Sequence, residues 1–163
     1  MSDRSKAIDA ELCGRIEHLL ADYAQAIDDD ALERWPEFFT EDGFYQIIPR
    51  DGFEAGQTIG ILSCTGRGMM RDRIAALRTA NIYEPHTYCH VLSRSRLSAS
   101  ANGAIEARTN FALYRTMQGG GTELFAAGKY LDRIATADGA PLLRSRHVVL
   151  ESRRVDILIV LPI

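Results

Sequence analysis

The segment HTYCH, residues 86–90, contains the residues of this chain that are best suited to bind a metal. If the segment is a strand, His86 and His90 lie on one face and Cys89 lies on the other, so the three form a poor ligand set. No second pair of cysteines or histidines occurs at zinc or iron–sulfur spacing. We therefore interpret the segment as the start of a strand with one partly buried, hydrogen-bonded histidine, and we expect no metal site.

Acid–base chemistry is the second possibility. Proton transfer near neutral pH needs a desolvated Asp or His, and Tyr23, Asp42 and His90 supply suitable groups if the fold brings them to one pocket. In the simpler interpretation, Asp42 belongs to the turn Glu41-Asp42-Gly43 and Tyr23 belongs to the core. Nucleophilic catalysis has no support, because the stretch from Ser63 to Gly66 lacks a nucleophile-elbow pattern.

Length and composition limit the class of protein. A chain of 163 residues is expected to form one domain, residues 1–163, with a substantial core. The net charge is −3 and there is no basic run, so nucleic acid is an unexpected partner. No apolar stretch approaches the roughly 20 residues that span a bilayer, and the N-terminus has no signal-peptide core, so we expect a cytoplasmic protein without a membrane segment. The three cysteines, an odd number and far apart, suit a reducing compartment.

The stretch from Ala104 to Ile134 predicts the longest element of the fold. Its first half alternates apolar and polar residues, which is the period of a half-buried strand. The triple glycine, residues 119–121, supplies a turn, and the stretch from Thr122 to Ile134 again carries alternating large residues. A long antiparallel hairpin is therefore expected. The apolar positions of the first half are Ile105, Ala107, Phe111, Leu113 and Met117.

Three helices are expected before this hairpin. Apolar residues at three- and four-residue steps predict the first helix over Ala7 to Ile27. Asp30 and Glu33 resemble a capping box that opens a short second helix, which Pro36 kinks or restarts. A third amphipathic helix is expected from about Met69 to Thr79.

The other strands are expected at Phe44 to Ile48, Tyr88 to Leu97 and Leu142 to Ser152, with a loop from Arg50 to about Gly68. Helices followed by antiparallel strands predict an α+β domain, in which a curved, mainly antiparallel sheet packs on the three helices as a cone with a hollow mouth. A last apolar segment, Val155 to Val160, precedes Leu161-Pro162-Ile163. If this end is exposed, it favours self-association into at least a homotrimer.

Two groups of residues resemble known families. The first resembles the opening of the nuclear transport factor two-like (cystatin-like) superfamily of cone-shaped domains: Tyr23-Ala24, Ile27-Asp28, Trp35, Phe39-Thr40, Glu41-Asp42-Gly43 and Tyr45. The second resembles the small (beta) subunit of the aromatic-ring-hydroxylating dioxygenases: Asp72-Arg73-Ile74, Ala76-Leu77-Arg78, Tyr83-Glu84-Pro85-His86, His90, Asn110, Gly128-Lys129-Tyr130-Leu131-Asp132, Arg146, Val148-Val149-Leu150 and Leu161-Pro162-Ile163. The chain departs from the second group at Cys89 and in the loop from Gly52 to Gly66.

The resemblance to the small subunit implies a non-catalytic role. It implies a terminal oxygenase of three large and three small subunits, with the small subunits as a trimer. The large subunit then carries the Rieske iron–sulfur cluster and the mononuclear iron, and this chain carries neither cofactor nor catalytic residues. This agrees with the missing ligand pattern, because a Rieske centre needs paired Cys and His ligands. The stretch Tyr83-Glu84-Pro85-His86 resembles members that act on aromatic acids.

Two other interpretations stay open from the sequence. A free-standing dehydratase, isomerase or epoxide hydrolase of the same superfamily would use Tyr23, Asp42 and His90 in the cone, because one fold serves many functions. A small-ligand binding module without catalysis is the third interpretation.

Overall fold

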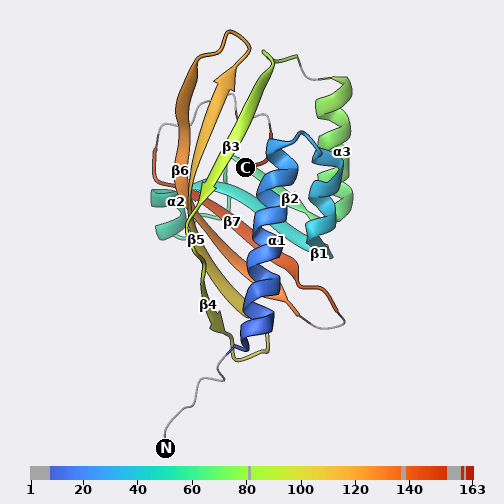
Figure 1. Ribbon diagram of the computed structural model, residues 1–163, viewed down its shortest axis with the longest axis vertical. Helices are drawn as coiled ribbons and strands as arrows, with labels where there is room; N and C mark the ends of the chain where they lie inside the picture. The colour runs from blue at the N-terminus through green and yellow to red at the C-terminus, as the bar shows by residue number, and fades with distance from the viewer. Residues whose placement is uncertain (1–7, 81, 137–138, 154–158, 160) are drawn as a thin grey trace, which may run out of the picture.

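The computed structural model describes residues 8–80, 82–136, 139–153, 159 and 161–163. Most of the helical residues precede the long strands, as the sequence predicts (Figure 1). The elements are α1 (Ala10–Asp28), η1 (Leu32–Phe38), β1 (Phe39–Pro49), α2 (Arg50–Glu54), β2 (Leu62–Thr65), α3 (Gly66–Thr79), β3 (His86–Leu92), β4 (Arg96–Ala99), β5 (Ile105–Met117), β6 (Thr122–Ala135) and β7 (Leu142–Leu150).

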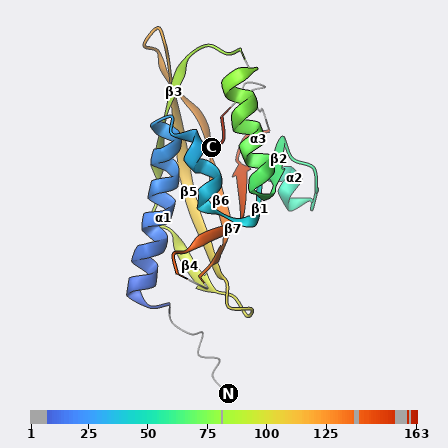
Figure 2. The same ribbon diagram turned by 90° about the vertical axis from the view of Figure 1, so that its right-hand side faces the viewer.

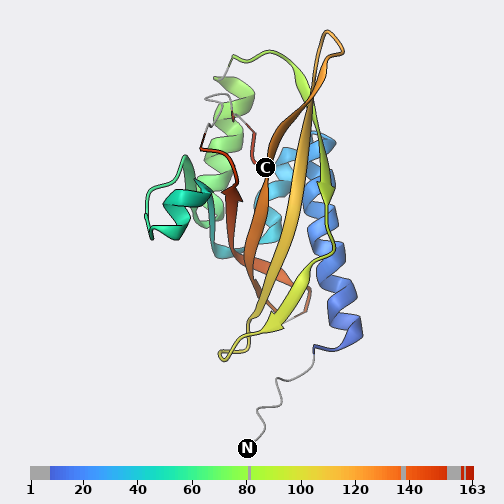
Figure 3. The same ribbon diagram turned by 90° about the vertical axis from the view of Figure 1, so that its left-hand side faces the viewer.

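The strands form one open, mixed sheet in the order β2-β1-β7-β6-β5-β3, and β4 also pairs with β5. All neighbours are antiparallel except β1 and β7, which run parallel. Helices α1, η1 and α3 lie on one face of the sheet (Figure 2), and the opposite face carries long strands open to view (Figure 3). The expected α+β fold, with a mainly antiparallel sheet covered by helices, is confirmed.

The expected hairpin is confirmed as β5 and β6. Buried and exposed residues alternate along most of β5, which matches the period of two in the sequence. At the turn, the Met117 N–H donates to the Gly121 carbonyl at 2.9 Å. Gly120 has a φ of +91°, a value that glycine adopts without a steric penalty.

Several element boundaries differ from the prediction. The first strand begins at Phe39 instead of Phe44, and the predicted loop contains the short helix α2 and the edge strand β2. The single strand expected over Tyr88 to Leu97 is divided into β3 and β4. The break lies between Leu92, where β3 ends, and Arg96, where β4 begins. In this gap the side chain of Ser93 accepts a hydrogen bond from the backbone N–H of Asn110 of β5, at 3.0 Å.

The predicted capping box is wrong. Asp30 has a φ of +56° and lies before η1, whose N-cap is Ala31 without a side-chain hydrogen bond. Arg78 of α3 binds both carboxylates instead: its Nη1 is 2.9 Å from Asp30 Oδ1, and its Nε is 2.8 Å from Glu33 Oε1. A contact between distant elements therefore replaces the local cap.

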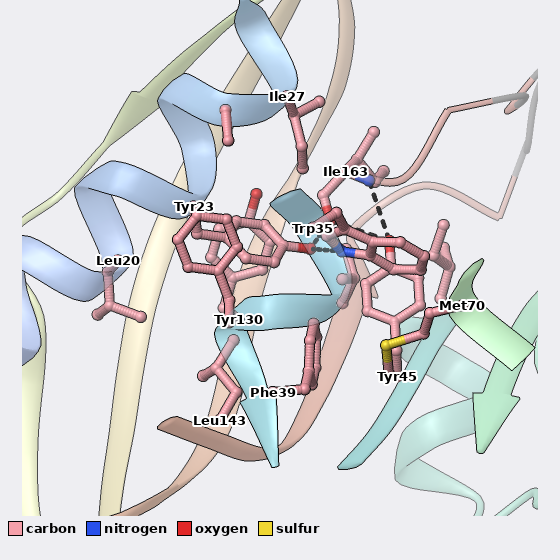
Figure 4. Packing of buried hydrophobic residues seen from close by; sticks show 14 of the residues in the cluster. Leu20, Tyr23, Ile27, Trp35, Phe39, Tyr45, Met70, Tyr130, Leu143 and Ile163 are labelled. Atoms are coloured by element: carbon pink, nitrogen blue, oxygen red, sulfur yellow. Dashed lines mark hydrogen bonds between the residues drawn. The ribbon is translucent and has the colours of Figure 1, made fainter. Parts of the chain in front are cut away.

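The space between the sheet and its helices holds an aromatic core. Trp35 and Tyr45 are fully buried, with ring centroids 5.0 Å apart in an edge-to-face arrangement. Leu161 and Ile163 also belong to this core, so this part of the C-terminal stretch is not an exposed apolar edge. Figure 4 shows Ile163 among the core side chains. The apolar segment predicted over Val155 to Val160 lies outside the described residues, except for Ile159. No helix in the described part of the chain is long and apolar enough to cross a membrane.

Candidate functional site

A pocket opens where the ends of α1 and α3 face the start of β3. Its volume is about 540 Å³. Its walls are mostly apolar or aromatic, and its acidic residues come from the end of α1 and the residues that follow it. The lining residues are Ile27, Asp28, Asp30, Leu77, Arg78, Ile82, Tyr83, Pro85, His86, Thr87, Tyr88 and Leu161. We call it the mouth pocket, and it corresponds to the mouth of the expected cone.

His90 lies behind this pocket and is held by a carboxylate from α1. Its side chain is fully buried, and its Nδ1 is 2.5 Å from Asp28 Oδ1. The backbone N–H of His90 donates to the other oxygen of Asp28 at 2.9 Å. Because a carboxylate only accepts hydrogen bonds, Nδ1 carries the proton that is shared with it. The pair fixes the imidazole and ties α1 to β3.

His86 is fixed in a similar way on the same face of β3. Its Nδ1 donates to the Glu84 carbonyl at 2.9 Å. The Nε2 atoms of His86 and His90 are buried, and neither has a hydrogen-bond partner among the described residues. The ring of Tyr88 lies between the two imidazoles. Its centroid is 5.1 Å from that of His86 and 6.3 Å from that of His90. Cys89 is exposed. The described residues contain no group of three potential metal ligands.

Tyr23 lies deeper, in the aromatic core. Its hydroxyl donates to the backbone oxygen of Ile163 at 3.1 Å and accepts from Trp35 Nε1 at 3.1 Å. Tyr45 also donates to the oxygen of Ile163, at 3.0 Å (Figure 4). Burial raises the pKa of Tyr23, so its hydroxyl stays protonated near neutral pH. Its hydroxyl is engaged in hydrogen bonds that tie α1 and η1 to the C-terminal residue.

A buried ion pair fills the floor of the interior. Arg146 binds both oxygens of Asp132 at 2.8 Å, and both side chains are completely buried. The guanidinium lies between two tyrosine rings, 4.0 Å from the centre of Tyr23 and 3.9 Å from that of Tyr130. Burial by itself would lower the pKa of Arg146, but the charge and hydrogen bonds of Asp132 raise it, so the guanidinium stays charged.

Asp42 is separate from these residues. It is exposed on β1, and its carboxylate accepts from the Thr40 hydroxyl at 2.9 Å. It is not among the residues that line the mouth pocket. The structure therefore does not bring Tyr23, Asp42 and His90 together as an acid–base set, because Asp42 faces solvent and Tyr23 is engaged in the core.

Sequence reasoning missed the carboxylates that matter here. Asp28 follows the buried Ala24 by one helical turn, so its position at the edge of the apolar helix face was a usable signal. Asp132 lies two residues from Tyr130 and two from Ile134 along β6. Residues two apart in a strand lie on the same face, so Asp132 is on the buried face with these two. The pairing of Asp28 with His90, 62 residues away, has no local signal.

Residues 23–156 match the family described as the ring hydroxylating beta subunit. The chain belongs to this family. It is 38% identical over 141 residues to the anthranilate 1,2-dioxygenase small subunit of Burkholderia cepacia, covering 86% of this chain and 88% of that one. It is 42% identical over 143 residues to a terephthalate 1,2-dioxygenase terminal oxygenase subunit (beta 2) of Comamonas sp., covering 88% and 93%.

A solved structure agrees with these sequence relatives. The beta subunit assigned to an aromatic-ring-hydroxylating dioxygenase of Novosphingobium aromaticivorans superposes with a TM-score of 0.81 at 32% identity, over 89% of this chain and 92% of that one. The function of the chain is therefore that of a small subunit of a ring-hydroxylating dioxygenase. This supports the small-subunit interpretation over the free-standing dehydratase or isomerase.

Proposed function

We propose that the chain is a structural subunit of an oxidoreductase complex and has no active site of its own. The observation that carries the proposal is how the cone interior is occupied. Tyr23 and Tyr45 bind the backbone of Ile163, and the Arg146–Asp132 pair lies beneath them. A substrate has no room at these hydroxyls while Ile163 holds this position.

The cofactors belong to the partner in this proposal. A large subunit carries the Rieske cluster and the mononuclear iron, and supplies the electron transfer and oxygen chemistry of the complex. The cysteines of this chain do not fit a Rieske cluster, because Cys13 is on α1, Cys64 on β2 and Cys89 on β3. They are free thiols, which suits the cytoplasm, where we place the complex.

We infer an assembly of three large and three small subunits, with the small subunits as a homotrimer. The C-terminal residues Leu161 and Ile163 are buried within the chain, so they no longer support this inference as an exposed edge. Support comes instead from three exposed apolar side chains at one end of the sheet: Val91 on β3, Tyr114 on β5 and Leu124 on β6, exposed by 53%, 40% and 58%. Exposed apolar clusters commonly mark protein contacts.

The substrate class proposed for the complex is an aromatic carboxylate. The two relatives described above are named for anthranilate and terephthalate, and each of these compounds carries a carboxylate on an aromatic ring. The small subunit supports the large subunit that dihydroxylates such a compound.

Purification of the chain with and without its large subunit tests this proposal. We expect the chain alone to contain no stoichiometric iron, and the co-expressed pair to form a complex with equal numbers of both subunits. Light scattering should give at least a trimer of the small subunit. A stable monomer at micromolar concentration, both alone and beside the large subunit, would contradict the proposed assembly.

A further inference from the structure

A row of side chains crosses the outer face of the sheet, opposite the helices. In the strand register, Arg96 of β4 pairs with Arg108 of β5, Arg108 with Leu131 of β6, and Leu131 with His147 of β7. Partners in register lie side by side on one face, so these four residues form a continuous floor. Figure 3 shows this face, with β4, β5 and β6 in view.

The floor belongs to an open pocket of about 530 Å³, which is within the usual size of small-molecule sites. We call it the outer pocket. The residues that line it are Phe53, Arg96, Ser98, Glu106, Ala107, Arg108, Leu131, Asp132, Arg133, Ser145 and His147. It is separated from the mouth pocket by the sheet itself, so a ligand in it does not compete with Ile163.

Two arginines lie side by side at one end of the outer pocket. Arg96 and Arg108 are exposed and directly opposite each other, and neither forms an ion pair within the described residues. Two carboxylates lie nearby, and each is closest to another basic residue: Glu106 is 3.9 Å from Arg133, and Glu151 is 2.9 Å from Arg50. Of the two arginines, Arg108 also interacts with the charge of Glu151. Like charges directly opposite each other destabilise a strand pair. A bound anion would remove this repulsion and accept hydrogen bonds from both guanidinium groups.

The other end of the outer pocket is aromatic and uncharged. The ring of His147 lies 5.7 Å from Phe53 and 5.4 Å from Phe44. Burial lowers the pKa of His147, so the imidazole is neutral at neutral pH. Arg108 and His147 are two strands apart, which corresponds to roughly 10 Å. Leu131 provides an apolar surface between them.

We propose that the outer pocket binds an aromatic carboxylate. Its carboxylate group lies on Arg96 and Arg108, and its ring covers Leu131 and reaches Phe53 and His147. The site needs both ends, because the arginines select the charge and the apolar end selects the ring. The ligand class rests on the substrate class proposed above, whereas the site rests on the strand register, which places two arginines side by side at one end and an aromatic group at the other.

Calorimetry on the purified full-length chain tests the site with benzoate as the probe and benzamide as its neutral counterpart. We expect benzoate to bind with a Kd at least tenfold lower than that of benzamide. The double variant Arg96→Gln/Arg108→Gln should lose roughly tenfold or more in benzoate affinity, because two charge-assisted contacts are removed. Arg144→Gln is the matched control, since Arg144 is an exposed arginine of β7 outside the pocket, and it should leave binding unchanged.

Several outcomes would overturn the site. Equal binding of benzoate and benzamide, no benzoate binding to the wild-type chain, or full benzoate affinity in a folded double variant would each do so. If the large subunit blocks benzoate binding and the double variant weakens the complex, a protein carboxylate occupies the arginines instead. Turnover of an aromatic acid by the complex is measured separately. If turnover is normal but benzoate does not bind to the outer pocket, the proposed site is wrong and the proposed function still holds.

Discussion

Buried charge is the most consequential feature at the scale of single residues. Arg146 and Asp132 are both inaccessible to solvent, yet each satisfies most of the bonding needs of the other. The flanking rings of Tyr23 and Tyr130 add favourable contacts to the guanidinium. In this chain the Arg146–Asp132 pair is part of the core, so removing it should lower the free energy of unfolding.

Replacing Asp132 by Ala should therefore destabilise the chain strongly. The change leaves the Arg146 charge buried without a partner, which typically costs about 3 to 5 kcal/mol. Urea unfolding measures the loss. Glu106→Ala is the control, because Glu106 forms an exposed pair with Arg133 at 3.9 Å, and such pairs contribute about 1 kcal/mol or less. Equal effects of the two changes would contradict the structural role of the buried pair.

His147 should make folding sensitive to mild acid. Burial lowers the pKa of His147 in the folded chain, while the unfolded chain has the ordinary value of about 6.5. As the pH falls below that value, the unfolded state takes up the proton first, so the free energy of unfolding decreases. In His147→Gln, the decrease between about pH 7 and pH 5 should be smaller than in the wild type. An unchanged slope in urea unfolding at these pH values would exclude this cause.

The residue scale is also where sequence reasoning was weakest. His90 was identified as a candidate that shares a pocket with Tyr23 and Asp42, but the carboxylate that it contacts is Asp28. Asp42 is a carboxylate, as the hypothesis requires, but its position on β1 exposes it to solvent. Which carboxylate meets a histidine depends on how α1 packs against β3, and the sequence near either residue does not contain that information.

At the scale of elements, the close approach of β6 and β7 depends on a glycine. A Cβ on Gly128 would lie 2.1 Å from the Val149 carbonyl oxygen, which is backbone and cannot move easily. Gly128→Ala should therefore force the two strands apart. We expect a loss of about 2 kcal/mol or more, as for other overpacked sites. Thermal or urea unfolding checks this.

Gly119→Ala is the matched control for this change. A Cβ at Gly119 has no atom within 4 Å, and no positive φ constrains the position. Its effect should stay within about 0.5 kcal/mol. If Gly128→Ala were as well tolerated as Gly119→Ala, the described spacing of β6 and β7 would be wrong.

Elements with a strong local pattern were predictable, and elements that depend on distant partners were not. The β5–β6 hairpin follows from alternation and a glycine turn, and α1 follows from its apolar stripe. In contrast, β2 has four residues and pairs only with β1 at the edge of the sheet. The parallel pairing of β1 with β7 joins residues far apart in the chain, such as Tyr45 and Arg146, and no local residue pattern specifies it.

At the scale of the whole molecule, the two faces of the sheet have different roles. The helix-covered face encloses a core that the chain fills with its own residues, including Ile163. The outer face presents the arginine pair and, toward one end, the exposed side chains of Val91, Tyr114 and Leu124. In the proposed structural role, these outer surfaces contact other subunits of the complex.

The most direct test of this account is turnover per intact complex. His90→Ala or Asp28→Asn disrupts the hydrogen-bonded pair of His90 and Asp28, and each complex is purified with its large subunit before an aromatic acid is supplied. We predict a loss of about 1 to 2 kcal/mol in the stability of the chain, from the lost buried hydrogen bond, and turnover within a few-fold of the wild type. The isolated chain should show no turnover. A decrease of about 10² to 10⁴-fold in correctly assembled complexes, as expected for a lost general acid or base, or any turnover by the chain alone, would contradict a structural subunit.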